Sequence, residues 1–221
     1  MFVKNFLFIC RLVLVFTIGN IYTLFFGKEH SFNYIIKQLA STNIFFLKIF
    51  QSLSTNSKLL TKQQNDYLIQ YTDSVPYNNN DINHDFINDI IDISKDKTVN
   101  IDLSKPIQSG AIALIYKGTI GDKNIVVKVK KKNIKRKIEE GINYMYVLGY
   151  IIEKLDLIPA LDPIILIDEN KDIMLKQTDF INEVNNLKRM KKDCLNIDYI
   201  KIPEVYPEYT HKNNNIIIMD Y

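Results

Sequence analysis

The sequence predicts an α+β fold in which helices flank a small antiparallel sheet. Two apolar, β-branched runs, Ala113 to Ile120 and Ile125 to Val129, stand on either side of the turn-forming residues Gly121 to Asn124, which indicates a β-hairpin. A third strand-like run is Ile216 to Tyr221. Apolar residues recur at helical spacing both before and after the hairpin. The 221 residues allow one sizeable domain with additional elements.

The first 27 residues are strongly apolar, and residues 12–26 carry no charge. Three interpretations remain open. The segment is long enough for a membrane-spanning or signal-anchor helix. Arg11 and Asn20 instead favour a helix that is buried in the domain or lies on a membrane. Lys4 suits a cleaved signal peptide, although no Ala-x-Ala-like site follows it. We therefore expect membrane association, with lipid as a partner, and leave the compartment open.

Residues 28–97 are expected to form a helical extension. Helical spacing continues from Ser31, a candidate N-cap, to Ser54. Within it, the apolar stretch Ile44 to Leu53 places Lys48 and Gln51 on one face, because they are three residues apart. On periodicity alone, this stretch is a core helix whose lysine reaches water.

Two further helices are expected in this extension. The polar stretch Leu60 to Tyr71 has Thr61 as its candidate cap. The next helix ends at Ile93 and has either Asp81 or Asn83 as its cap.

Residues after the hairpin predict more helix. The basic run Lys128 to Lys137 leads into an amphipathic helix, Ile138 to Leu157, which Pro159 ends. Another helix is expected from Met174 to Lys192. Between them, the run Ile164 to Ile167 fits either a short strand or the end of a helix.

Composition excludes several classes of function. The net charge of +3 gives no basic excess, and no aromatic residues interleave with the basic run, so we expect no nucleic-acid partner. The basic run suits a solvated strand end or, alternatively, a contact with anionic lipid. Cys10 and Cys194 are far apart, and the three histidines lack metal-ligand spacing. We therefore expect no metal site.

The segment Pro106 to Lys132 has the layout of a kinase-type nucleotide cradle. Gln108, Ser109, Gly110 and Ala111 are mostly small residues that precede the hairpin. Small residues in such a loop let backbone N–H groups approach phosphates, and a lysine inside the following apolar strand reaches the same phosphates as a point charge.

The strand lysine is Lys128, which needs a carboxylate to keep its charge and its direction. The candidate partner is Glu183, on the later helix. The alternative is that Lys128 is an ordinary surface lysine of a strand and Glu183 a solvated helix residue. Spacing alone leaves both open.

Several motifs in series make the chain resemble the UbiB-type atypical protein-kinase-like family, which is associated with ubiquinone biosynthesis. Lys48–Gln51 is similar to the family's Lys-x-Gly-Gln motif, and Pro106–Ile115 is similar to its Ala-rich loop. Val126–Lys130 is similar to its Val-Ala-Val-Lys-Val-Gln strand, and Gln177–Asn186 to its Glu-x-Asp-Tyr-x-x-Glu-Ala-x-Asn segment. Two later strands of the family are similar to Ile202–Tyr206 and Ile217–Tyr221. The resemblance covers roughly residues 40–221. It implies that residues 98–221 form a kinase-like N-lobe.

Some residues depart from the family pattern. Phe50 stands where the family has the glycine of Lys-x-Gly-Gln, and Gln177 stands where it has the glutamate of Glu-x-Asp. The Ala-rich loop has become Gln-Ser-Gly-Ala. The resemblance implies that the helix with Lys48 and Gln51 lies over the nucleotide site and blocks protein substrates. It also implies that Gln177 and Asp179 are partners of that helix.

The resemblance implies ATP as the cofactor, bound by Lys128, Glu183 and the loop residues 108–111. Tyr221 corresponds to the hinge of a kinase, so the C-lobe, with its catalytic loop and Mg²⁺-binding aspartate, is expected to be absent from this sequence or supplied by a partner chain. We therefore assign no catalytic residue and expect neither Mg²⁺ binding nor turnover by this chain alone. The alternative, from another class, is a non-catalytic module that docks a membrane or a protein.

Overall fold

The computed structural model describes residues 2–54, 60–73, 75–93, 95, 98–156, 162–212 and 214–221. The chain forms two compact units. The helical unit consists of Met1–Asp73 and Lys135–Met174, and the sheet unit of Ser74–Ile134 and Leu175–Tyr221. This grouping does not follow the expected boundaries, because residues 135–174 join the N-terminal helices. The predicted helix end at Pro159 lies outside the described residues.

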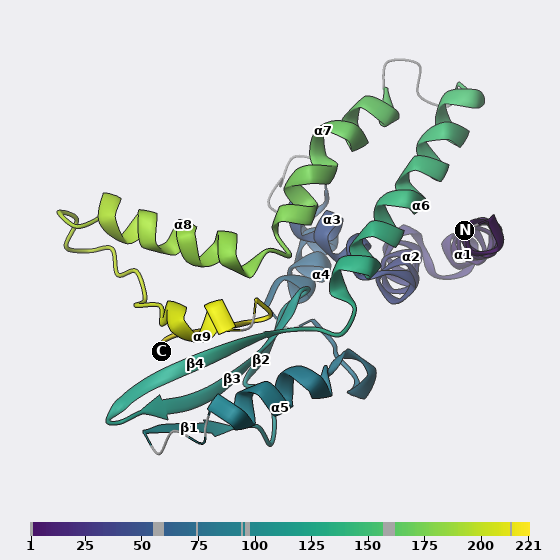
Figure 1. The fold of residues 1–221 in the computed structure, drawn as a ribbon. Coiled ribbons are helices and arrows are strands. Elements are labelled where there is room, and N and C mark those ends of the chain that lie inside the picture. The colour runs from purple at the N-terminus through teal and green to yellow at the C-terminus, as the bar shows by residue number, and fades with distance from the viewer. Residues whose placement is uncertain are drawn as a thin grey trace. The chain divides into compact units, whose positions relative to one another are not determined.

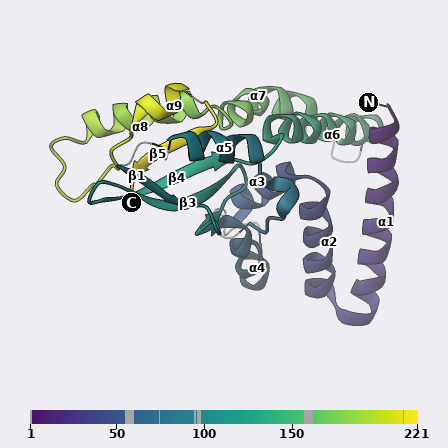
Figure 2. The same ribbon diagram turned by 60° about the horizontal axis from the view of Figure 1, so that its bottom comes forward.

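The described helices of the helical unit are α1 (Phe2–Phe26), α2 (Lys28–Thr42), α3 (Ile44–Ser54), α4 (Lys62–Asp73), α6 (Ile134–Lys154) and α7 (Pro163–Lys176). Figure 2 shows α1 and α2 side by side, joined by a turn at Gly27, whose φ of 87° favours glycine. The prediction that Ser31 caps a helix is wrong, because α2 begins three residues earlier. Ser31 is buried instead, and its hydroxyl donates to the Gly19 carbonyl at 2.7 Å.

Thr61 caps α4, as predicted. Its hydroxyl accepts a hydrogen bond from the backbone N–H of Gln64, and the Gln64 side chain accepts one from the backbone N–H of Thr61. This reciprocal pair is a capping box. The run Ile164 to Ile167, for which the sequence allows either a short strand or the end of a helix, lies in α7.

The sheet unit contains the strands β1 (Val99–Asp102), β2 (Gln108–Ser109), β3 (Ala113–Ile120), β4 (Lys123–Lys130) and β5 (Ile216–Asp220). They run in the order β1-β3-β4-β5, with β2 also pairing with β3, and all pairs are antiparallel. The helices of this unit are α5 (His84–Ile93), α8 (Phe180–Asp193) and α9 (Pro207–Lys212), with a 3₁₀ turn at Asn79–Asp81. The predicted hairpin is confirmed as β3 and β4.

The two faces of the sheet have different coverings (Figure 1), with α5 on one side and α8 on the other. The α5 side is the core, where Ile90 packs against residues that alternate along the strands, including Leu114, Val127 and Val129. Lys128 lies between Val127 and Val129, so its side chain faces α8. The alternation in β4 thus sends Val127 and Val129 to the core and Lys128 to the opposite face.

The helix expected from Met174 to Lys192 is interrupted. The chain turns at Gln177 and Thr178, and α8 begins only after Asp179, whose carboxylate accepts hydrogen bonds from the backbone N–H groups of Ile181 and Asn182. Helical spacing of the apolar residues on both sides concealed this break, although an aspartate is a strong helix start. The break separates α7 from α8.

Candidate functional site

Lys128 and Glu183 form an ion pair. The Lys128 ammonium lies 2.5 Å from a Glu183 carboxylate oxygen, and 24% and 30% of the two side chains are exposed. Lys128 is held in the middle of the sheet, where it pairs with Ile115 of β3 and Ile217 of β5. Both partners are therefore half-buried and accessible from one side, as a lysine that contacts a ligand must be.

Asp179 positions Glu183. Because Asp179 caps α8, Glu183 falls in the first turn of this helix, one turn after the cap. Gln177 is exposed in the turn before it. The carboxylate of Asp179 is thus engaged with its own helix. Its expected role as a partner of the Lys48 helix stays a prediction, because the two belong to different units.

Phe180 lies beneath the lysine, and sequence reasoning missed it. Its ring is fully buried, and the Lys128 ammonium lies 5.2 Å from the ring centroid. The negative face of an aromatic ring attracts a cation at this distance. The sequence shows Phe180 only as an apolar residue at helical spacing, which predicts a core position and not a contact with a lysine.

The loop before β3 is a tight turn. The Gly110 N–H donates to the Ala113 carbonyl at 2.9 Å, and the Ile112 carbonyl accepts from Lys131 at 2.9 Å. Gln108 pairs with Ile115, which pairs with Lys128, so Gln108 lies on the lysine face.

Ser109 lies on the other face of the sheet, in register with Leu114, and its side chain is buried. Ala111 is also buried. The loop therefore places Gln108 on the face of Lys128, and a contribution of Ser109, Gly110 and Ala111 to nucleotide binding through their backbone stays a prediction.

In the helical unit, Phe50 and Gln51 of the predicted Lys48–Gln51 motif connect α3 to α4. The Gln51 amide donates to the Tyr71 carbonyl at 3.0 Å, and the buried Phe50 ring lies 6.3 Å from that of Tyr71. Burial, followed by the hydrogen bond with Tyr67, raises the pKa of Tyr71. Lys48 is half-buried on the same helix. Phe50 thus fills space against α4.

Among the described residues, no group of three or more His, Cys, Asp or Glu side chains is arranged to hold a metal ion. The residues on the α8 face do fit the phosphates of a nucleotide. They offer an ammonium group fixed by a carboxylate and, on the same face of the sheet, the side chain of Gln108.

Comparison with known proteins decides the family. The ABC1 atypical kinase-like domain matches residues 71–221. The chain belongs to this family. As an ABC1 atypical kinase-like chain, it has the predicted kinase-like α+β fold with a small antiparallel sheet, and the resemblance to UbiB-type proteins is confirmed.

Named relatives support the same assignment. The chain is 24% identical to "Protein ACTIVITY OF BC1 COMPLEX KINASE 7, chloroplastic" of Arabidopsis thaliana, over 75% of this chain and 24% of that protein. It is 25% identical to "Probable protein kinase UbiB" of Glaesserella parasuis, over 79% of this chain and 33% of that protein. The chain thus spans about a quarter to a third of the length of these relatives.

Among solved structures, Rv3197 of Mycobacterium tuberculosis, in complex with erythromycin, is similar at a TM-score of 0.44 and 16% identity. The similarity covers 55% of this chain and 30% of that one.

Proposed function

We propose that this ABC1 atypical kinase-like chain binds ATP on the α8 face of its sheet. The observation that carries the proposal is the half-buried pair of Lys128 and Glu183. An ammonium group that is held by a helix carboxylate beside a small-residue turn is the arrangement by which kinases position phosphates. Lys128 would contact the phosphate oxygens, Glu183 would keep Lys128 aligned, and Gln108 and Gly110 would border the same site.

Catalytic turnover requires more than the nucleotide site formed around Lys128 and Glu183. Phosphoryl transfer depends on Mg²⁺ ligands and on a residue that orients the nucleophile, and in kinases these come from the second lobe. We propose that a second lobe, on further sequence or on a partner chain, completes the site.

The test is titration of ATP into the purified protein by calorimetry, with and without Mg²⁺. Binding to the native chain is expected, and Lys128→Ala should weaken it about tenfold or more, because hydrogen bonds to charged groups contribute about 1.5–3 kcal/mol. The matched control is Lys117→Ala, an exposed lysine on the neighbouring strand β3. Equal affinity of the native chain and Lys128→Ala would remove Lys128 from the site.

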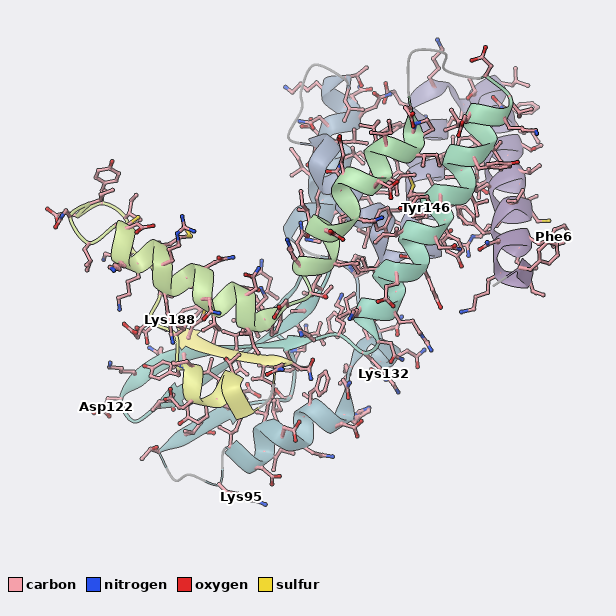
Figure 3. The ribbon with its side chains drawn as sticks, turned by 45° about the horizontal axis from the view of Figure 1, so that its top comes forward. Phe6, Lys95, Asp122, Lys132, Tyr146 and Lys188 are labelled. Carbon is pink, nitrogen blue, oxygen red and sulfur yellow. The ribbon has the colours of Figure 1, made fainter. Side chains whose placement is uncertain are left out.

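A second proposal, attachment to a membrane, rests on α1. This 25-residue helix is long and apolar enough to cross a membrane. Its buried residues, Phe8, Leu12, Val15 and Gly19, form one stripe, and large apolar side chains on its other faces are exposed. Figure 3 shows Phe6 projecting away from the neighbouring helices.

Polar contacts along α1 favour a helix that lies on the membrane. Lys4 pairs with Glu140 of α6 at 2.5 Å, and Arg11 donates to the Ser41 hydroxyl of α2 at 2.8 Å. A helix that crossed the bilayer alone would lose both contacts. We therefore propose that α1 remains packed on the helical unit and inserts its exposed apolar side into the interface of the bilayer.

Flotation with phospholipid vesicles tests this attachment. The double variant Phe6→Glu, Leu14→Glu places charges on the exposed side of α1 and should abolish flotation. Leu195→Glu, at an even more exposed apolar residue of the sheet unit, should leave flotation unchanged. Release of the native protein at alkaline pH is expected of an interfacial helix, whereas resistance to release would indicate a spanning one.

A further inference from the structure

An apolar pocket lies in the helical unit between α6 and α7, which run side by side in Figure 1. Its volume is about 350 Å³. Residues between Ile142 and Ile152 of α6, residues between Pro163 and Met174 of α7, and Phe45 and Ile49 of α3 line it. All of them belong to the helical unit, whereas Lys128 and Glu183 belong to the sheet unit. The pocket is therefore a different site from the one proposed for ATP.

The lining of the pocket favours a hydrocarbon ligand. Among the described residues that line it, Asn170 and Lys171 are the polar ones, and both are engaged within α7. The Asn170 amide donates to the Leu166 carbonyl at 2.8 Å, and the Lys171 ammonium donates to Asp168 at 2.6 Å. A nucleotide, a sugar or a peptide backbone would give up hydrogen bonds with water for apolar contacts there, which costs free energy.

The pocket is long and narrow. Ile142 and Ile152 are ten residues apart on one helix, so the pocket extends over about 15 Å at the rise of about 1.5 Å per residue. Its volume then corresponds to a mean cross-section of about 23 Å². A β-strand needs about 47 Å², from spacings of about 4.7 and 10 Å, and a helix needs about 80 Å². The pocket is thus too narrow for a strand or a helix of a partner and wide enough for an extended, unbranched chain.

The walls of the pocket are linked, and its rim is apolar. The Tyr146 hydroxyl of α6 donates to Asp168 of α7 at 2.5 Å, which holds the two helices together beside the pocket. Leu166 lines the pocket and is 46% exposed, and its neighbour Ile165 is 54% exposed. A chain can therefore enter from the exposed side of α7 without crossing a charged barrier.

We infer that this pocket binds the linear acyl chain of a fatty acid or of a membrane lipid. The hydrocarbon core of a bilayer is about 30 Å thick, so one acyl chain spans about 15 Å, the depth of one leaflet. That depth matches the length of the pocket. The polar group of the ligand stays in water at the rim. The inference goes beyond nucleotide binding, and it does not need attachment of α1 to a membrane, because a free fatty acid supplies the same chain.

The experiment measures displacement of the fluorescent fatty acid cis-parinaric acid from the intact chain by saturated fatty acids, from octanoate to hexadecanoate. Affinity should rise about two- to fourfold with each methylene group up to about dodecanoate, since each one leaves water. Longer chains should bind no more tightly, because their additional methylene groups stay outside the pocket. A rise that continues unchanged to hexadecanoate would indicate adsorption to exposed apolar surface and would overturn the pocket.

A second probe distinguishes the two sources of the chain. Dodecylphosphocholine, used below the concentration at which it forms micelles, has the headgroup of a phospholipid on a chain of the same length as dodecanoate. Displacement by both probes shows that the chain alone decides binding. Displacement by dodecanoate alone assigns the pocket to free fatty acids, and displacement by dodecylphosphocholine alone assigns it to phospholipids.

Substitutions inside the pocket should reduce binding. Leu148→Phe narrows the pocket near its middle and should weaken dodecanoate binding about tenfold or more, because several methylene groups lose their place. Ile152→Phe shortens the pocket from one end and should shift the maximum affinity to a shorter chain. Thermal unfolding shows whether each variant folds, and Ile152→Phe carries the test if Leu148→Phe does not fold.

The matched control is Ile173→Phe, at a residue of α7 that is 57% exposed and does not line the pocket. It should leave the affinity for dodecanoate unchanged.

The double variant Phe6→Glu, Leu14→Glu separates this site from α1. It alters the exposed side of α1 and should leave dodecanoate binding intact. Loss of binding in this variant, with normal binding by folded Leu148→Phe, would assign the fatty acid to α1 and overturn the pocket. No displacement by any chain would overturn it too, while ATP binding and vesicle flotation would stand on their own measurements.

Discussion

The ammonium group of Lys128 lies 2.5 Å from the carboxylate of Glu183, although 55 residues separate the two in the sequence. The distance is short because each residue is fixed by its own element. Lys128 stands in the middle of a strand with neighbours on both sides, and Glu183 stands one turn after the cap of α8. The ion pair therefore joins α8 to the sheet.

Glu183→Gln is predicted to weaken the contact between α8 and the sheet without unfolding the protein. Both side chains are about a quarter exposed, so solvent screens the pair and its loss should lower the free energy of unfolding by about 1 kcal/mol. Nucleotide affinity should fall because Lys128 loses its alignment. Urea unfolding and calorimetry measure the two effects. Arg189→Gln, which breaks an exposed pair with Asp193 on the same helix, should change neither.

Asp179→Ala is predicted to lower the free energy of unfolding by about 1 kcal/mol, because two backbone N–H groups at the start of α8 lose their acceptor. Glu183 lies in the turn that frays, so nucleotide binding should weaken as well. Hydrogen exchange should rise in the first turn of α8 and not in its last. Asp179→Asn keeps an acceptor and should restore protection. Unchanged exchange in Asp179→Ala would show that the cap is dispensable.

The sequence was informative where one physical pattern acted alone. Alternation and turn residues located β3 and β4, and a polar residue before a helical pattern located the cap at Thr61. The pairing of Lys128 with Glu183 could be inferred only as one alternative, because it depends on tertiary packing. Phe180 was missed for the same reason, since a phenylalanine in a helix reads as a core residue.

Two predictions from the sequence are wrong. Local signals predict Ser31 as a helix cap and Met174 to Lys192 as one helix. The Ser31 hydroxyl donates to the carbonyl of Gly19 on the adjacent helix. The expected helix is interrupted before Asp179, which caps α8. A contact with another helix decided the first, and the local cap at Asp179, which apolar periodicity does not register, decided the second.

Two glycines of α6 should respond differently to replacement by alanine. A Cβ at Gly141 would overlap the Cβ of Phe45 and lie 2.9 Å from the Asn43 side-chain oxygen. Asn43 is fixed there, since it also bonds the Lys137 carbonyl at 2.9 Å. Gly141→Ala should therefore lower the free energy of unfolding by about 1–3 kcal/mol, as overpacking does.

The matched comparison is Gly149→Ala. Its Cβ would meet the ends of two isoleucine side chains, at 3.0 and 3.3 Å, which can move, and the Cβ of Pro163 at 3.4 Å, which is close to an ordinary contact distance. Alanine also favours helix over glycine by up to about 1 kcal/mol. Gly149→Ala should thus be neutral or stabilising in thermal unfolding. Equal destabilisation by both substitutions would contradict close packing of α6 on the start of α3.

Acid should loosen the contact between α6 and α7. Asp168 accepts hydrogen bonds from Lys171 at 2.6 Å and from Tyr146 of α6 at 2.5 Å. The bond from Lys171, followed by that from Tyr146, lowers the pKa of Asp168 below its ordinary 3.8. A lowered pKa means that the carboxylate stabilises the fold above this ordinary value, and that the contribution is lost as pH falls through the lower folded value.

At the alkaline end, the hydrogen bonds to Asp168 and then to Tyr146 raise the pKa of Lys171 above 10.5, so its contribution is lost only as pH rises through that raised value. The hydrogen bond to Asp168 also raises the pKa of Tyr146 above 10.0. The contact should therefore be complete between about pH 4 and pH 10. Hydrogen exchange in α6 and α7, referenced to an unstructured peptide, should show protection that falls below pH 4. Asp168→Asn should remove this dependence, and an NMR titration in which Asp168 protonates at or above its ordinary value would contradict it.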